Sequence, residues 1–173
     1  MSMTIRHSRI AGFLVGLSLF VAANAQAAVE GVPEARDLSV FSSPTARSGL
    51  PLLLVFTADG CGYCIRLADE VLVPMIRSGE YDERATIRAV NLSRALLVDF
   101  TGASVAPWEF ARRYDVKVTP TLIVVDREGT PLAKPLVGLG TSEYFELSIA
   151  EVLDEAAGVL ARRGALPAVR GSP

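Results

Sequence analysis

The stretch Val55–Leu72, "VFTADGCGYCIRLADEVL", holds both cysteines of this 173-residue chain, Cys61 and Cys64. It lies where a continuous apolar run, "LLLVFT" (52–57), gives way to apolar positions at helical spacing. The apolar run predicts a buried strand, and the pattern after it predicts a helix over 62–77. The two cysteines are therefore expected at a strand-to-helix junction, with Cys61 at the amino end of the helix.

Three roles are open to this pair of cysteines. Zinc needs about four ligands, and the chain offers two cysteines and His7, which lies in a segment expected to be removed. A structural disulfide usually closes a longer loop than two residues. In a redox pair, the helix amino end would favour a thiolate at Cys61, and Cys64 would attack a mixed disulfide formed there. The redox role is favoured, with Gly62 and Tyr63 completing the motif, and the structural bridge remains the alternative.

The first 27 residues, "MSMTIRHSRIAGFLVGLSLFVAANAQA", combine a basic start, an apolar run and a small-residue end. That layout predicts a secretory signal peptide. A membrane anchor is the weaker interpretation, because the apolar run is shorter than the ~20 residues that span a bilayer. Cleavage is expected after Ala27, with Ala25 as the alternative. The predicted organisation is a signal peptide (1–27), one domain (28–163) and a flexible tail (164–173).

The charge of the chain gives little indication of a charged partner. Removal of the two arginines within residues 1–27 leaves 15 basic against 19 acidic residues, a net charge of −4. A modest acidic balance does not support nucleic acid or an anionic membrane as a partner.

The rest of the chain predicts alternating strands and helices. The expected elements are an amino-terminal helix after Pro33, strands at 86–92 and 121–126, a helix at 107–116, an edge strand at 132–138 and a helix at 141–163. Residues 93–106 are less readable, and a short hairpin around Thr101-Gly102 is expected there. This order predicts an α/β fold, in which helices cover both faces of a mixed sheet.

These features together resemble the thioredoxin superfamily over about residues 50–160. The resemblance rests on the strand "LLLVFT", on "CGYC" opening a helix and on "VTPT" leading into a later strand. The segments "CGYCIRLADEVLVP", "VDFTG", "EFARRYDVKVTPTLIVVDREG" and "LVGLG" are most similar to bacterial periplasmic thioredoxin-like proteins of the SoxW type. The resemblance implies a thioredoxin fold, a cis peptide bond before Pro120 beside the disulfide, and pairing of the Thr119 backbone with the substrate.

The sequence departs from thioredoxins proper around the cysteines. Gly60 and Tyr63 replace the usual Trp and Pro of "WCGPC", and Val55 replaces the usual buried acid. Asp59 is closer in sequence but is expected to be exposed, so the usual proton acceptor for Cys64 is missing. "CGYC" also resembles periplasmic disulfide isomerases, although too few residues precede the first strand for their dimerisation domain.

The resulting expectation is an exported, periplasmic thiol–disulfide oxidoreductase. Cys61 and Cys64 are the predicted catalytic residues, and Thr119 and Pro120 the predicted substrate-side wall. No metal or bound cofactor is required, because electrons move through the two sulfurs. By resemblance, the protein is expected to be a reductase of protein or small-molecule disulfides, supplied with electrons by a membrane thiol-transfer protein. It is also expected to be a monomer. An oxidase or isomerase, and a non-catalytic binding module or chaperone on the same fold, are the alternatives.

Overall fold

The computed structural model of the chain describes residues 29–43, 49–138 and 140–164. The predicted signal peptide (1–27) therefore lies outside the described residues, as does the predicted tail after Gly164. Four strands form the main sheet in the order β2-β1-β5-β6, and the predicted α/β fold with a mixed sheet is confirmed.

The strand β1 (Leu52–Thr57) lies in the interior of this sheet. It pairs parallel with β2 (Thr86–Asn91) and antiparallel with β5 (Thr121–Val125), and β5 pairs antiparallel with β6 (Leu136–Val137). Every residue of β1 and β5 is buried, because helices cover both faces of the sheet. The continuous apolar runs of the sequence are thus explained by burial on two sides.

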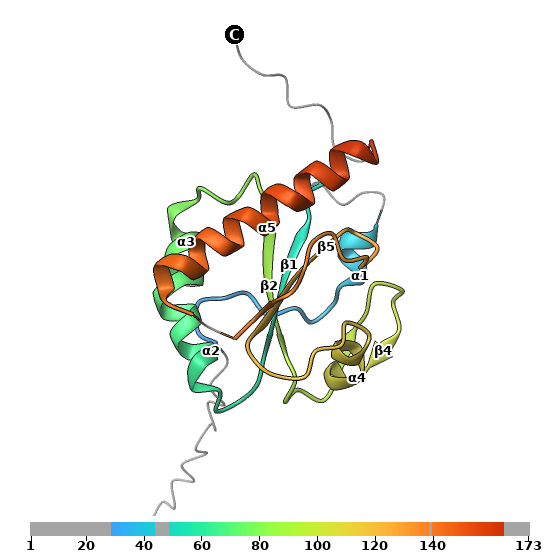
Figure 1. The fold of residues 1–173 in the computed structure, drawn as a ribbon. Helices are drawn as coiled ribbons and strands as arrows, with labels where there is room; N and C mark the ends of the chain where they lie inside the picture. Colours follow the sequence, from blue (N-terminus) through green and yellow to red (C-terminus); the bar gives the residue numbers. More distant parts are fainter. Residues whose placement is uncertain (1–28, 44–48, 139, 165–173) are drawn as a thin grey trace, which may run out of the picture.

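The helices form one layer on each face of the sheet, and α5 crosses in front of the strands in Figure 1. One hydrophobic core lies under α2 (Gly62–Leu67), η1 (Ala68–Leu72), α3 (Val73–Ser78) and α5 (Ser142–Arg162). The other lies under α1 (Ser39–Ser42), α4 (Pro107–Arg112) and the hairpin of β3 (Leu97–Val98) and β4 (Ser104–Val105). The hairpin expected within residues 93–106 is confirmed.

The predicted amino-terminal helix is wrong over most of its length. The chain after Pro33 is extended and pairs with β2. The Ala35 N–H donates to the Ala89 carbonyl at 2.8 Å, and the Ala89 N–H donates to the Pro33 carbonyl at 2.9 Å. Only Ser39–Ser42 is helical. The apolar side chains were correctly expected in the core, since Leu38 is fully buried. The exposed edge of β2 offered backbone partners that side-chain spacing does not reveal.

The helix that follows the cysteines runs without a break from Gly62 to Ser78, and its middle turn, Ala68–Leu72, is π-helical. Pro74 explains this wider turn. Proline has no N–H to donate, and in a regular α-helix its ring would meet the carbonyl of the residue four positions earlier, Glu70. The predicted helix is confirmed, with a local change that the proline requires.

Two other predicted elements are shorter than expected. The helix predicted over 107–116 ends at Arg112, and Asp115 then adopts a left-handed backbone with φ of 54°. The predicted edge strand over 132–138 is reduced to Leu136–Val137, directly after Pro135. The chain also contacts β5 before Pro135, since the Leu132 N–H donates to the Val124 carbonyl at 2.8 Å. A proline cannot donate to a strand ladder, so the pairing is interrupted at Pro135 and the regular strand lies beyond it.

The turn of the β3–β4 hairpin is organised by Asp99, whose side chain is 2 % exposed. Its Oδ1 accepts hydrogen bonds from the N–H and hydroxyl of Thr101 and from the Ala103 N–H, and its Oδ2 accepts one from Arg113 at 2.7 Å. Burial by itself would raise the pKa of Asp99, but the hydrogen bonds from Thr101, Arg113 and Ala103 outweigh it and lower the pKa to about 2. The ionised carboxylate is therefore the form that stabilises this turn.

Replacing Asp99 with Asn is expected to destabilise the protein in a pH-dependent way. The pKa is 3.8 in the ordinary case and about 2 in the folded protein, so the carboxylate contributes about 2 kcal/mol above pH 4. That contribution is lost as the pH falls through the folded pKa. Urea unfolding should show that Asp99→Asn is less stable than the wild type by about 2 kcal/mol at neutral pH. At about pH 2.5, less than half of this difference should remain.

Asp115→Asn is the matched control for this measurement. The Asp115 side chain is 83 % exposed and forms an ion pair with the exposed Lys117. An exposed ion pair of this kind contributes about 0–1 kcal/mol. A deficit in Asp99→Asn that stays constant between the two pH values would contradict the role assigned to the carboxylate.

Candidate active site

The two cysteines form a disulfide at the amino end of α2. The Sγ atoms are 2.08 Å apart and the Cα atoms 5.2 Å apart. Cys61 is the N-cap residue of the helix, and its Sγ accepts a hydrogen bond from the Cys64 N–H at 3.1 Å. The strand-to-helix placement expected from the sequence is therefore confirmed, and one sulfur already lies against a backbone N–H of the helix end.

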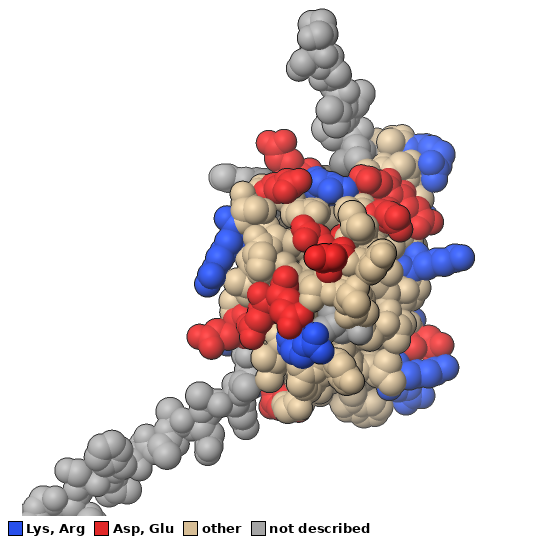
Figure 2. Space-filling model, turned by 60° about the vertical axis from the view of Figure 1, so that its left-hand side comes forward, with Lys and Arg blue, Asp and Glu red and all other residues tan. Residues whose placement is uncertain are grey.

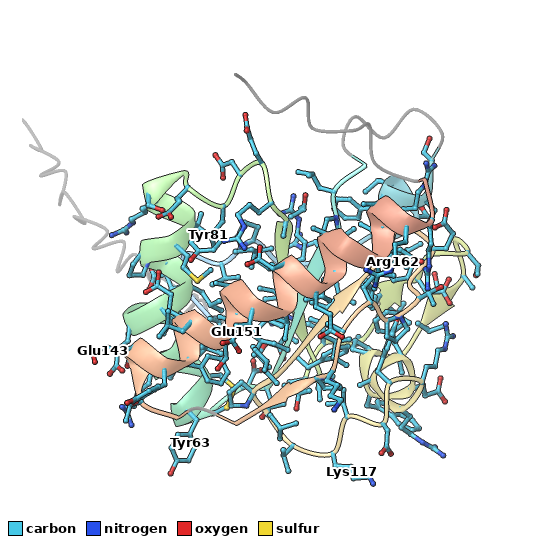
Figure 3. All side chains as sticks on the ribbon, turned by 45° about the horizontal axis from the view of Figure 1, so that its top comes forward. Tyr63, Tyr81, Lys117, Glu143, Glu151 and Arg162 are labelled. Atoms are coloured by element: carbon cyan, nitrogen blue, oxygen red, sulfur yellow. A yellow bond between two sulfur atoms is a disulfide. The ribbon has the colours of Figure 1, made fainter. Side chains whose placement is uncertain are left out.

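The two sulfur-bearing residues differ strongly in exposure. Cys61 is half-buried, whereas Cys64 is 1 % exposed and packs in the core beneath α2. Between them, Gly62 is exposed, and Tyr63 is 61 % exposed and points away from the body of the protein (Figure 3). An incoming thiolate or disulfide can therefore reach Cys61 from solvent, while Cys64 is accessible only through Cys61.

The loop before β5 brings the other predicted residues to the disulfide. The Thr119 hydroxyl lies 3.4 Å from the Cys61 Sγ and donates to it. The Thr119–Pro120 peptide bond is cis, as the resemblance implied, and Pro120 is buried. The structure thus assembles Cys61, Cys64 and Thr119 from two segments that are 55 residues or more apart in the sequence.

A polar network that the sequence analysis missed holds the loop in front of Cys61. The Asn91 side-chain amide donates to the Asp59 carboxylate at 2.7 Å, and the Asp59 N–H donates to the Ser93 hydroxyl at 3.0 Å. Asp59 itself is exposed, as expected. The signal was present in the sequence, since polar residues that end the second of two parallel strands must lie beside the residues that end the first.

The surroundings of Cys64 are apolar. Val55, at the position where thioredoxins usually have an acid, is fully buried in the same cluster as Cys64 and Leu122. On the face that Figure 2 shows, acidic side chains are spread over the upper and middle parts, and the lowest part is mostly tan. The buried side of the site is therefore apolar, whereas the exposed Asp59 lies in the loop directly before Cys61.

Two other kinds of site are not found in the described residues. Within them, no three His, Cys, Asp or Glu side chains are grouped so that they could hold a metal ion. Within the same residues, no helix has both the length and the apolar character to cross a membrane.

This arrangement permits thiol–disulfide exchange. The site combines a disulfide at a helix amino end, one half-buried and one buried cysteine, and a hydroxyl against the accessible sulfur. This is the site of a thioredoxin-fold thiol–disulfide oxidoreductase. Residues 44–153 match the thioredoxin-like domain family, and the chain belongs to that family.

Solved structures of other proteins share the fold. A thioredoxin-fold protein from Helicobacter pylori is 20 % identical, with a TM-score of 0.51, and the match covers 82 % of this chain and 98 % of that one. The DsbH oxidoreductase is 16 % identical, with a TM-score of 0.53, over 89 % and 95 % of the two chains. No curated protein sequence matches the chain significantly. The similarity to these structures supports the fold and leaves the substrate open.

Proposed function

We propose that this protein is an exported reductase of protein disulfides, which works through the Cys61–Cys64 pair. The observation that carries the proposal is the asymmetry of the disulfide: Cys61 is half-buried at the helix amino end, whereas Cys64 is buried beneath it. In the reduced protein, the Cys61 thiolate attacks a substrate disulfide, a mixed disulfide forms, and one substrate thiolate leaves. Cys64 then attacks Cys61, which releases the second substrate thiol and closes the Cys61–Cys64 bond.

The exposed side chains around the site favour a polypeptide substrate. Tyr63 and Ile65 flank Cys64, Val118 precedes Thr119, and Val137 pairs with the residue that follows Pro120; all four side chains are exposed. Such an apolar border around one reactive sulfur suits a protein chain with apolar residues next to its cysteine. Pairing of the Thr119 backbone with that chain, which the family resemblance implies, would orient the substrate disulfide toward Cys61.

Export to the periplasm is part of the proposal and rests on residues 1–27, which have the pattern of a signal peptide. The direction of electron flow and a membrane thiol-transfer protein as electron donor rest on the similarity of the motifs to SoxW-type proteins.

Mass spectrometry of the protein recovered from the periplasm should show a mature chain that begins at Ala28. An intact form that keeps Met1 and stays in the membrane would contradict export.

Insulin reduction in the presence of dithiothreitol tests the activity. The protein should accelerate precipitation of the insulin B chain well above the rate with dithiothreitol alone, whereas a non-catalytic binding module would not.

Equilibration with glutathione buffers tests the direction of electron flow. A reductase should have a potential below about −200 mV, and a value near about −120 mV would instead indicate an oxidase.

A further inference from the structure

Thr57, the last residue of β1, has a buried hydroxyl that the proposed reaction has not yet used. Its side chain is 1 % exposed, and its Oγ1 has no hydrogen-bond partner among the described residues. Each of the other buried polar side chains of the described chain forms a hydrogen bond; these residues are Asn91, Asp99, Thr121 and Asp126. Burial of an unpaired hydroxyl is unfavourable, so this exception calls for a physical explanation.

Strand geometry places this hydroxyl on the face of the sheet that carries Cys64. Successive side chains of a strand point to opposite faces. Leu53 and Val55 lie in the core cluster that contains Cys64, whereas Phe56 lies in the cluster on the other face. By the same alternation, Thr57 belongs to the Cys64 side, two residues beyond Val55 and closer to the cysteines.

The register of the sheet places Thr57 at the active-site end. Phe56 is opposite Thr121 in the antiparallel pair, so one further step brings Thr57 opposite Pro120. Residues directly opposite each other share a face of the sheet. Thr57 is thus flanked by Asn91 of β2 on one side and by the Pro120 loop, which contacts Cys61 through Thr119, on the other.

We infer that the Thr57 hydroxyl is a hydrogen-bond donor to the Cys64 sulfur when the disulfide is open. This inference rests on the proposed function, because it gives Thr57 a role in the redox reaction of the cysteine pair. When a thiolate attacks the Cys61 sulfur of the oxidised protein, the new S–S bond forms there and the Cys61–Cys64 bond breaks. Cys64 leaves with the electron pair as a thiolate in apolar surroundings, where the usual acid is replaced by Val55.

A hydroxyl without a partner in the oxidised protein would gain one at that moment. The hydrogen bond would stabilise the Cys64 thiolate, which is the leaving group in one direction and the attacking group in the other. Since the oxidised form has the unpaired hydroxyl and the reduced form the paired one, Thr57 shifts the equilibrium toward the reduced protein. Thr57 therefore stabilises the thiolate by donating a hydrogen bond, and it does not accept a proton as the buried acid of thioredoxins proper does.

Thr57→Val and Thr57→Ser separate the hydroxyl from the shape of the side chain. Valine keeps the shape and removes the O–H group, whereas serine keeps the O–H group and removes a methyl. In glutathione buffers, we expect the equilibrium constant for reduction to fall about tenfold in Thr57→Val, equivalent to about 30 mV. We expect Thr57→Ser to stay within about twofold of the wild type.

A second measurement detects the contact without any redox cycle. In a Cys61→Ser background, Cys64 is the only thiol, and the ultraviolet absorbance of its thiolate can be followed against pH. Adding Thr57→Val should move the midpoint of Cys64 ionisation to higher pH by about one unit, which corresponds to a tenfold weaker preference for the thiolate. Adding Thr57→Ser should leave the midpoint near its original position.

The outcomes distinguish this inference from the proposed function. If Thr57→Val keeps both the equilibrium constant and the ionisation midpoint, or if Thr57→Ser shifts them as far as Thr57→Val does, the hydroxyl is not a donor to Cys64. A purely structural role would change the stability of the oxidised and reduced proteins equally and leave both readouts in place. Failure of the proposed function would appear instead as a wild-type protein that does not reduce insulin, and the ionisation measurement would still test the contact.

Discussion

A reduced Cys64→Ser variant is expected to accumulate as a stable mixed disulfide with insulin through Cys61. The accessible Cys61 can attack the substrate, but the serine that replaces Cys64 cannot resolve the product. Turnover should therefore fall to the rate without protein, while nearly one substrate chain is captured per protein molecule. Non-reducing electrophoresis and mass spectrometry of the adduct measure this directly.

Cys61→Ser is the matched control, because it makes the same chemical change at the other sulfur. Turnover should fall equally far, but no adduct should accumulate, since Cys64 is 1 % exposed beneath α2. If the adduct forms with Cys61→Ser and not with Cys64→Ser, the roles of the two cysteines are reversed. If neither variant loses activity, the reaction does not pass through this pair.

Gly129→Ala is expected to destabilise the protein by about 2–4 kcal/mol, through backbone strain and overpacking together. Gly129 ends the turn after β5 and has a φ of 86°, a conformation that side-chain-bearing residues rarely adopt. A Cβ atom there would lie 2.5 Å from the Phe100 ring and 3.0 Å from the Tyr114 hydroxyl. Both neighbours belong to the packing of the β3–β4 hairpin and α4, so the aromatic ring has little room to move.

Gly102→Ala separates the two causes. Gly102 has nearly the same φ, 85°, but a Cβ atom built on it would have no neighbour within 4 Å. It should therefore lose only the backbone contribution, about 1–2 kcal/mol. Urea unfolding of the two variants against the wild type measures the difference. Equal losses would show that the contact with Phe100 costs nothing.

The apolar runs and helical spacing of the sequence were sufficient to predict the layers of the fold. β1, β5 and α5 were predicted closely, because their side chains are buried at the spacing that defines each element. The extended segment after Pro33 was not predictable in this way. Its backbone conformation is determined by hydrogen bonds to Ala89 and Val98, which are distant in the sequence, and its apolar spacing is compatible with either conformation.

The candidate site divides in the same manner. The sequence identified Cys61 and Cys64, and the helix behind them placed Cys61 at its amino end; the resemblance pointed to Thr119 and Pro120. All four residues are brought together by the structure. The polar network of Asp59, Asn91 and Ser93 was missed, because the sequence analysis did not follow the pairing of β1 and β2 to the ends of both strands.

The sequence by itself determined which residues form the candidate site and the type of each long element, since both depend on residue identity and local spacing. Tertiary structure decided what surrounds those residues. It buried Cys64 and left Cys61 accessible, brought the Thr119 hydroxyl to the Cys61 sulfur, and enclosed the Thr57 hydroxyl with no partner among the described residues. Exposure and hydrogen-bond partnership depend on the register between strands that are distant in the chain, and this register is fixed only when the sheet and its helices pack together.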